Sequence, residues 1–303
     1  MQRIKSTIGV LSLAVAVGAM LLSVPAGSAK TPVQRAWKIA LTSNRQGDSE
    51  IYSMNADGTH VRRLTHSKKF DGAGPWSPDG RKLLFYSQRT GGDVWVMNAN
   101  GAAQRRLTRN RAWDAPGGWS PDGQKILFAS NRDGNNELYV MNADGSGQRN
   151  LLPSPSSQEW PGGWSPDGRS IAFVTDRDGN WEIYVMSADG SNPRNLTRNV
   201  ANDGGVAGLS GVTWAPDGRI LYASTRDTRD QDHPELYAMD ADGSNVRRLT
   251  RTPGTEGLVS ISPGGGKLAF WRYPTKPRWA FFVMNADGSG VRKVNWKLPG
   301  AER

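Results

Sequence analysis

A five-residue motif, Trp-Ser-Pro-Asp-Gly, recurs along the chain and constrains its fold more than any other feature. It occurs unaltered from Trp76, Trp119 and Trp164, and in altered form from Trp214 and Ile261. A second motif, close to Met-Asn-Ala-Asp-Gly, begins at six positions: Met54, Met97, Met141, Met186, Met239 and Met284. These are 43, 44, 45, 53 and 45 residues apart. Repeats of this length indicate an array of small supersecondary units.

Each unit has the same plan. An apolar run such as Lys125–Ala129 follows the Pro-Asp-Gly turn, and a run such as Leu138–Met141 precedes the Asp-Gly or Asn-Gly turn. Short runs between glycine turns are typical of strands, and these dipeptides favour tight hairpins because they accept positive φ. Four antiparallel strands per unit at this period describe a propeller blade. The sequence predicts an all-β, six-bladed β-propeller over residues 30–303.

These motifs resemble the TolB-like β-propeller repeat over about residues 37–294. The resemblance implies an exported, non-catalytic propeller that binds other proteins of the cell envelope. The protein that gives the family its name carries an α/β domain ahead of its propeller, whereas only seven residues separate Ala29 from Trp37 here. The resemblance therefore covers the propeller part alone.

The N-terminus has the pattern of a targeting segment. Arg3 and Lys5 precede an uncharged run from Ile8 to Val24, and small residues follow up to Ala29. This pattern predicts an export signal over residues 1–29, with a retained membrane anchor as the alternative. No later stretch is apolar enough to span a membrane. We expect a periplasmic or secreted protein.

The charge and cysteine count narrow the class of partner. The net charge is +10, of which the leader supplies two, and cysteine is absent, which excludes disulfides and thiolate chemistry. A basic chain can bind nucleic acid, but an exported protein rarely meets it. We therefore expect an envelope protein partner, no nucleic acid and a monomeric protein.

An arginine and an acid recur together when the units are aligned with one another. The arginine ends the second strand of five units, at Arg45, Arg89, Arg132, Arg177 and Arg226. The acid opens the third strand of the same five, at Glu50, Asp93, Glu137, Glu182 and Glu235. Pro274 and Ala280 replace both in the sixth unit. This joint loss predicts a cross-strand ion pair in each blade. A ring of free arginines that holds an anionic ligand is the alternative.

A second arginine occurs in all six units, at Arg62, Arg105, Arg149, Arg194, Arg247 and Arg292. It falls on the predicted outermost strand of each blade. Charge on such a strand discourages pairing with other chains. A basic belt for an acidic partner is the alternative.

The best candidate site lies where the inner strands begin. An acid stands five residues before the inner-strand Trp or Ile in four units, at Asp71, Asp114, Glu159 and Glu256. Large aromatics accompany these acids, at Phe70, Trp113, Trp160 and Trp181. Inner strands line the channel of a propeller, so these eight residues predict a partner-binding face at its mouth. Packing between blades is the alternative. The glycine-rich segment 199–212 is either a flexible lid over this face or a tolerated insertion.

The stretch from Asn131 to Gly145 resembles a calcium loop but lacks its required residues. Asn136 stands where the loop needs glycine, and Asn142 stands where it needs glutamate. Calcium bound in a different oxygen cage is the alternative to an ordinary turn. We expect no metal and no cofactor.

Enzymatic activity is the alternative to binding, because some related propellers are sugar lyases. Channel-mouth carboxylates would suit a polysaccharide lyase or hydrolase. The histidines, His60, His66 and His233, fall in different loops and do not converge on one metal. Four similar acids at equivalent places in the repeat favour a structural role in each unit over a catalytic one. We therefore expect no catalytic residue.

Overall fold

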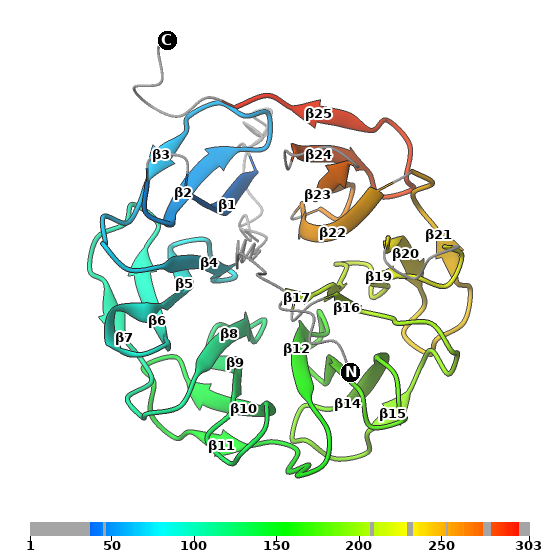
Figure 1. Cartoon of the computed structure of the whole chain (residues 1–303), viewed down its shortest axis with the longest axis horizontal. Coiled ribbons are helices and arrows are strands. Elements are labelled where there is room, and N and C mark those ends of the chain that lie inside the picture. The colour runs from blue at the N-terminus through cyan, green and yellow to red at the C-terminus, as the bar shows by residue number, and fades with distance from the viewer. Residues whose placement is uncertain are drawn as a thin grey trace, which may run out of the picture.

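The computed structural model describes residues 37–296 except 45–46, 207–208, 229–232, 253, 263 and 275–279. It is a six-bladed β-propeller of antiparallel sheets, which confirms the predicted fold (Figure 1). The predicted export signal lies outside the described residues. Within those residues, no helix is long and apolar enough to cross a membrane.

The first three blades follow one another along the chain, and each runs from the channel outwards. Blade one contains β1 (Lys38–Ser43), β2 (Glu50–Asn55) and β3 (Arg62–Arg63). Blade two contains β4 (Asp71–Trp76), β5 (Lys82–Ser87), β6 (Asp93–Asn98) and β7 (Arg105–Arg106). Blade three contains β8 (Asp114–Trp119), β9 (Lys125–Ser130), β10 (Glu137–Asn142) and β11 (Arg149–Asn150). A 3₁₀ turn, η1 (Gln88–Thr90), joins β5 to β6.

The other three blades complete the ring. Blade four contains β12 (Glu159–Trp164), β13 (Ser170–Thr175), β14 (Glu182–Ser187) and β15 (Arg194–Asn195). Blade five contains β18 (Val212–Trp214), β19 (Ile220–Ser224), β20 (Glu235–Met239) and β21 (Arg247–Arg248). Blade six contains β22 (Gly254–Ile261), β23 (Lys267–Pro274), β24 (Ala280–Asn285) and β25 (Arg292–Val294).

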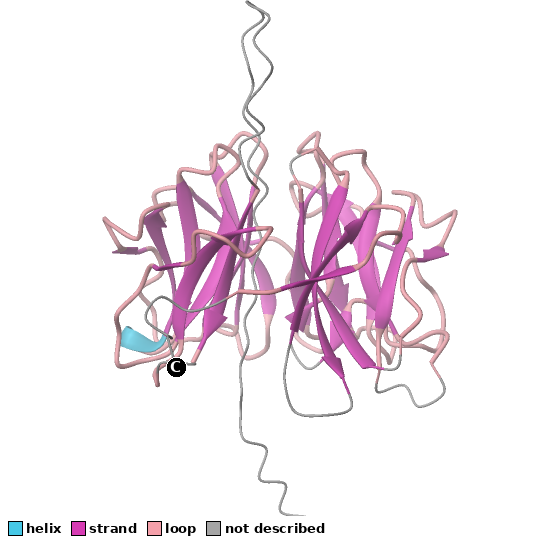
Figure 2. Cartoon of the chain, turned by 90° about the horizontal axis from the view of Figure 1, so that it is seen from above, coloured by secondary structure: helices cyan, strands magenta, loops and turns pink. Residues whose placement is uncertain are grey.

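The two ends of the propeller differ in the connections that they carry. One end, the turn face, has the tight turns between first and second strands and between third and fourth strands. The other end, the loop face, has the connections between second and third strands and the interblade loops, which run from an outer strand to the next inner strand. In the edge-on view, η1 marks the loop face (cyan, Figure 2).

Blade one has three strands among the described residues, so its inner strand is not among them. The sequence offers two segments that could supply this strand, residues 31–36 and the tail around Trp296. Trp296 follows β25, the outermost strand of blade six, and its ring centroid lies 6.3 Å from that of Phe281. It packs against the cluster between blades six and one. The other candidate, residues 31–36, lies outside the described residues.

Segment 199–212 contains a small hairpin inserted into the inner strand of blade five. Its strands are β16 (Gly205–Val206) and β17 (Leu209–Ser210). Asp203, before the hairpin, still bridges Ser224 of β19, so the inner strand resumes its pairing on both sides. The hairpin lies near the centre of the ring, with β17 beside β12 (Figure 1). The segment is therefore an insertion, and its motion as a lid stays a prediction.

Glycines and prolines let the inner strands approach one another closely around the channel. A β-carbon added to Gly117 of β8 would lie 2.4 Å from Cβ of Pro161 in β12, so only glycine fits there. A bulge interrupts β8 between Pro116 and Gly118, and β12 has the equivalent bulge. Such bulges bend a strand and increase its twist, as the crowded centre of a propeller requires.

The hydrophobic core is distributed between neighbouring blades. One cluster joins Leu84 and Val96 of blade two to Phe128 and Tyr139 of blade three, with the motif residue Trp119 between them. The indole Nε1 of Trp119 donates to the Pro75 carbonyl of the preceding blade at 3.3 Å. The motif tryptophan therefore packs between blades, as the repeat predicts.

The recurring arginines of the outer strands connect one blade to the next. Arg105 donates to the carbonyl of Asp144 at 2.7 Å, Arg149 to that of Asp189 at 3.4 Å, and Arg194 to that of Asp242 at 3.2 Å. Each acceptor lies in the tight turn of the following blade. Three of these residues thus form polar links between blades, a role that neither sequence interpretation included.

Candidate functional site

The predicted pairs between second-strand arginines and third-strand acids are wrong. Arg132 lies within 3.3 Å of Asp114 on the inner strand, rather than pairing with Glu137. The same pairing joins second and inner strands in five blades: Arg89–Asp71, Arg132–Asp114, Arg177–Glu159, Arg226–Asp203 and Arg272–Glu256. Arg45 lies outside the described residues. The arginine turns inwards because the inner-strand carboxylate is fully buried and needs a counter-charge.

Each of these arginines also lies over a pair of aromatic rings. The guanidinium carbon of Arg132 is 5.4 Å from the ring centroid of Phe128 and 4.5 Å from that of Tyr139. Equivalent pairs of rings lie beneath the arginine in the other four blades. Aromatic faces attract a cation, so the rings hold the guanidinium in place. Acid, arginine and aromatic pair form one repeated structural unit.

The third-strand acids have a different role, since they fasten the interblade loops. Glu137 accepts from the backbone N–H of Ser154 at 2.6 Å and from the Asn150 amide at 2.6 Å. Glu50 accepts from Arg63 at 2.7 Å and from the backbone N–H of Ser67 at 2.5 Å. These carboxylates fix the path by which the chain leaves each outer strand.

The four predicted channel-mouth acids are therefore not presented to solvent. Asp71, Asp114, Glu159 and Glu256 are 0% exposed, and each lies against an arginine. Burial raises the pKa of Asp71 and of Glu159, against the opposing effects of their hydrogen bonds and arginines. One oxygen of each of these two carboxylates has no hydrogen-bond partner among the described residues. Their placement supports the fold of each blade.

The predicted aromatics, by contrast, include a connected group on the loop face. Ring centroids are 5.8 Å apart between Phe70 and Tyr86, 5.8 Å between Tyr86 and Trp113, and 5.5 Å between Trp113 and Trp160. All four side chains are partly exposed. These residues, which we name the aromatic row, cross blades two, three and four. Each predicted aromatic adjoins a buried acid in sequence, so strand alternation directs the two to opposite sides.

Two predicted residues lie outside the aromatic row. Trp181 packs against the apolar core between blades four and five, as Trp160 also does, but no ring contact joins it to the aromatic row among the described residues. Glu256 lies on β22, the inner strand of blade six, on the far side of the ring from blade three (Figure 1). The structure thus brings Phe70, Trp113 and Trp160 together. It buries the adjoining acids Asp71, Asp114 and Glu159, and it leaves Trp181 and Glu256 outside the row.

Sequence reasoning missed two residues that the structure adds to these sets. Tyr86 joins Phe70 to Trp113, and it stands where the next blades carry Ala129 and Val174. Asp203 supplies the fifth buried acid, but the inserted hairpin hides its distance from the inner-strand Trp. Asp203 lies nine residues after the outer-strand arginine Arg194, just as Asp71 lies nine residues after Arg62. This shared spacing is the signal that could have identified it.

The interblade loops carry basic residues and no acids. Residues 64–70, 107–113, 151–158, 196–202 and 249–252 contain six lysines and arginines and neither aspartate nor glutamate. All six side chains are exposed: Lys68, Lys69, Arg109, Arg111, Arg198 and Arg251. Four of them lie in the two loops that carry Phe70 and Trp113. The loop face is therefore positive where the aromatic row begins.

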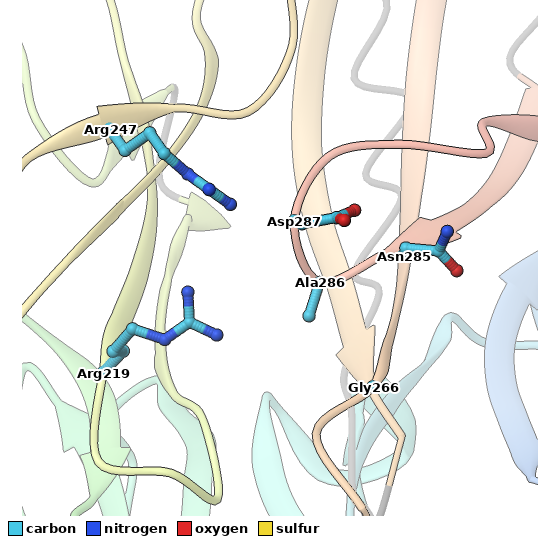
Figure 3. Close-up of a pocket in the computed structure, with 6 residues that line it drawn as sticks. All are labelled: Arg219, Arg247, Gly266, Asn285, Ala286 and Asp287. Carbon is cyan, nitrogen blue, oxygen red and sulfur yellow. The ribbon is translucent and has the colours of Figure 1, made fainter.

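A shallow pocket of about 380 Å³ lies on the opposite, turn face, between blades five and six. Arg219 and Arg247 reach from one side towards the Asn285–Asp287 turn on the other (Figure 3). The guanidinium of Arg219 is already paired with Asp217 at 2.7 Å. Hydrogen bonds from Ser289, and to a smaller degree the charge of Arg247, lower the pKa of Asp287. Its charges are largely balanced within the protein, so this pocket is a weaker candidate than the loop face.

The stretch from Asn131 to Gly145 consists of a hairpin loop over residues 131–136, strand β10 and the turn that follows it, and the polar groups of the loop are held by neighbouring residues. Asp133 accepts from the hydroxyl of Tyr139 and from the amide of Asn150. The Asn135 amide donates to the carbonyl of Ser154 at 2.8 Å. Across the described ranges, no group of three histidines or acids is placed to hold a metal ion. The absence of a cofactor stays a prediction.

Comparison with known proteins agrees with this architecture. The TolB beta propeller domain family matches residues 146–296. The protein TolB homolog of Chlorobium luteolum is 41% identical over 54 residues, which cover 18% of this chain and 12% of that protein. The match thus spans a small part of its curated relative.

Two solved structures share the propeller fold. Putative TolB from Agrobacterium tumefaciens superposes with a TM-score of 0.66 at 24% identity, covering 78% of this chain and 84% of that one. An oligogalacturonate lyase in complex with manganese superposes at 0.57 and 17% identity, covering 88% and 77%. At these identities the likeness concerns the fold alone. The matched domain, the six recurring motifs and the six blades together show that the chain belongs to the TolB-like β-propeller repeat family.

Proposed function

We propose that this protein is a non-catalytic propeller that binds a protein of the cell envelope through its loop face. The aromatic row carries the proposal, because it is a connected and partly exposed apolar surface that the core does not enclose. Clustered aromatics of this kind dominate the binding energy of many protein interfaces. The resemblance to TolB-like propellers supports an envelope partner.

The burial of the candidate acids supports binding over catalysis. A general acid or base must reach the proton that it transfers, and Asp114 and Glu159 are enclosed beside their arginines. The oligogalacturonate lyase and a puromycin-hydrolyzing peptidase of similar fold share 17% and 14% identity with this chain. Their activities therefore do not transfer to it.

The export pattern of residues 1–29 supports a periplasmic or secreted location. A fusion of these residues to a reporter active only outside the cytoplasm tests this part of the proposal. Reporter activity is expected with the natural leader. Equal activity after replacement of the run from Ile8 to Val24 by a polar sequence would contradict export.

Cross-linking to envelope extracts tests the binding proposal. The wild-type protein is expected to retain one envelope protein, and Trp113→Ala is expected to lose most of that retention. Tyr273→Ala serves as the control, since Tyr273 is a 38% exposed aromatic on blade six, away from the aromatic row. Equal retention by the wild type and both variants would contradict binding through this face.

A turnover assay tests the alternative. The purified protein is expected to leave oligogalacturonates and related glycans intact. Turnover that Glu159→Gln abolishes would replace the binding proposal with an enzymatic one.

A further inference from the structure

From the charges around the aromatic row we infer that the partner presents an acidic, extended segment carrying an apolar side chain. The segment would lie across the interblade loops that enter blades two and three. This inference rests on the proposed function, because it specifies the chemistry of the partner at the same face.

The cations of this face point outwards, whereas most of its acids point inwards. Lys68, Lys69, Arg109 and Arg111 are exposed and none is ion-paired among the described residues. The inner-strand carboxylates nearby are 0% exposed and already paired. A surface whose cations lack counter-ions attracts an anionic segment and speeds its association.

Two exposed acids on this face contact their own blades, whereas a third, Asp48 of blade one, is exposed in the connection between β1 and β2. Asp133 accepts from the Tyr139 hydroxyl, and Asp178 accepts from that of Tyr184. Hydrogen bonds from Tyr184 and Asn195 lower the pKa of Asp178, which keeps it ionised. Asp133 and Asp178 lie in the loops between second and third strands of blades three and four, away from the two interblade loops that carry the cations. Asp48 lies beside the loop that enters blade two, because the N–H of Asp71 donates to the carbonyl of Ser49, and it offsets one of the two lysines there.

The basic sector is confined to part of the ring. The loop that enters blade four, residues 151–158, has no charged residue and two prolines. The aromatic row begins at Phe70 and Trp113, in the same two loops as the four cations. Because the apolar and basic groups lie together on one side of the ring, they favour an extended peptide across these two loops over a ligand centred on the channel axis.

The arrangement of the rings favours a side chain over a sugar. Interplanar angles are 59° between Phe70 and Tyr86, 46° between Tyr86 and Trp113, and 74° between Trp113 and Trp160. Sugar rings stack on a flat aromatic face, whereas these rings are tilted against one another. Tilted and edge-to-face groups pack instead around a leucine or another aromatic side chain.

Fluorescence polarisation with labelled peptides tests the inference on the purified protein. The first probe is a ten-residue peptide of aspartates and glutamates around one leucine. The second replaces every acid with lysine, and the third replaces the leucine with serine. Polygalacturonate serves as an anionic glycan competitor. The first peptide is expected to bind at least about tenfold more tightly than either of the others, and more weakly as salt rises.

Charge reversal locates the surface. Arg109→Glu with Arg111→Glu is expected to weaken binding of the first peptide by about tenfold or more. Arg169→Glu with Arg251→Glu makes the same change of charge at an exposed site on the turn face and in the interblade loop that enters blade six, across the ring from the aromatic row. That control is expected to change affinity less than twofold.

Four outcomes would overturn the inference: no binding of the first peptide, equal binding of the lysine peptide, tighter binding of polygalacturonate, or equal effects of both double variants. Failure here is distinguishable from failure of the proposed function. If Trp113→Ala abolishes retention of an envelope protein while Arg109→Glu with Arg111→Glu leaves it intact, the face binds a partner of other chemistry.

Discussion

The side chain of Arg272 donates to the buried carboxylate of Glu256 at 2.7 Å, although Arg272 occupies a place in its strand where other blades carry serine or threonine. The arginine of the other blades lies two residues further along. The charge therefore reaches the same acid from a different position. The ion pair, rather than its sequence position, is what each of these five blades shares.

Removal of this arginine should destabilise the propeller. Arg272→Met leaves the fully buried Glu256 carboxylate without its counter-charge, which we expect to lower the free energy of unfolding by about 2–3 kcal/mol. For a domain of this size the melting temperature would fall by about 4–12 °C. Thermal denaturation followed by circular dichroism measures the change.

Arg81→Met is the control for this variant. Arg81 and Asp79 are 3.9 Å apart, with side chains 83% and 55% exposed, so the loss should be about 0–1 kcal/mol. Equal destabilisation by the two variants would show that the buried pair contributes nothing beyond a surface pair.

A glycine at the seam between blades three and four should be irreplaceable for a steric reason. Gly190 has a φ of +99°, and a β-carbon there would lie 2.1 Å from the carbonyl oxygen of Leu151 in the preceding blade. Gly179 has nearly the same φ, +97°, but nothing lies within 4 Å of its added β-carbon. Gly179→Ala should cost about 1–2 kcal/mol from backbone strain alone.

Gly190→Ala should cost about 1–3 kcal/mol more than Gly179→Ala, because overpacking adds to the same strain. Urea denaturation of both variants measures the difference. Equal costs would mean that the turn shifts freely and that adjacent blades are not in tight contact there.

The difference in stability between the wild type and Glu159→Gln should depend on pH. Burial raises the pKa of Glu159 above its ordinary value of 4.5, so the folded protein binds this proton more tightly than the unfolded chain. Ionised Glu159 therefore costs stability above its folded pKa, and the cost is relieved as pH falls towards 4.5. Wild type should gain stability relative to Glu159→Gln between pH 7 and pH 5.

Urea denaturation of both proteins at the two pH values tests this. The aspartates of the tight turns, such as Asp167, have lowered pKa values, so the stability that they contribute is lost only as the pH falls below 3.8. They are present in both proteins and do not affect the difference between them. A difference that moved in favour of the variant at pH 5 would mean that the folded state stabilises the ionised carboxylate.

Calcium should not stabilise the protein. The loop around Asp133 and Asn135 already contacts Tyr139, Asn150 and Ser154. A ligand at 100 times its dissociation constant adds about 2.7 kcal/mol, which corresponds to several degrees in melting temperature. We expect a shift below about 1 °C when calcium replaces a chelator. A rise of several degrees that Asp133→Asn removes would establish a calcium site.

The fold could be predicted because the same turn motifs recur in each of the six units of the chain. Each motif places a turn, and the period of the motifs sets the size and number of blades. The partner of each arginine could not be predicted in this way. A second strand has neighbours on both sides, and joint loss of Arg and acid in blade six did not show which side the arginine faces. Arg272 had taken over the role from an unaligned position.

The candidate site was predicted only in part. Phe70, Trp113 and Trp160 stand out as large aromatics beside acids, and the structure brings them together. The burial of those acids could not be predicted from the sequence, because an acid at the start of a strand can be either exposed or buried. Tyr86 was hidden inside an apolar strand, where only its departure from the repeat distinguishes it.

Calorimetry with a purified partner measures how much the aromatic row contributes to binding. The envelope protein retained by cross-linking is purified and titrated against wild type, Trp113→Ala and Tyr273→Ala by isothermal calorimetry. We expect Trp113→Ala to weaken affinity by at least about tenfold, or 1.4 kcal/mol, and Tyr273→Ala to change it less than twofold. Equal affinity of all three proteins, with the fold of each verified by circular dichroism, would contradict the account.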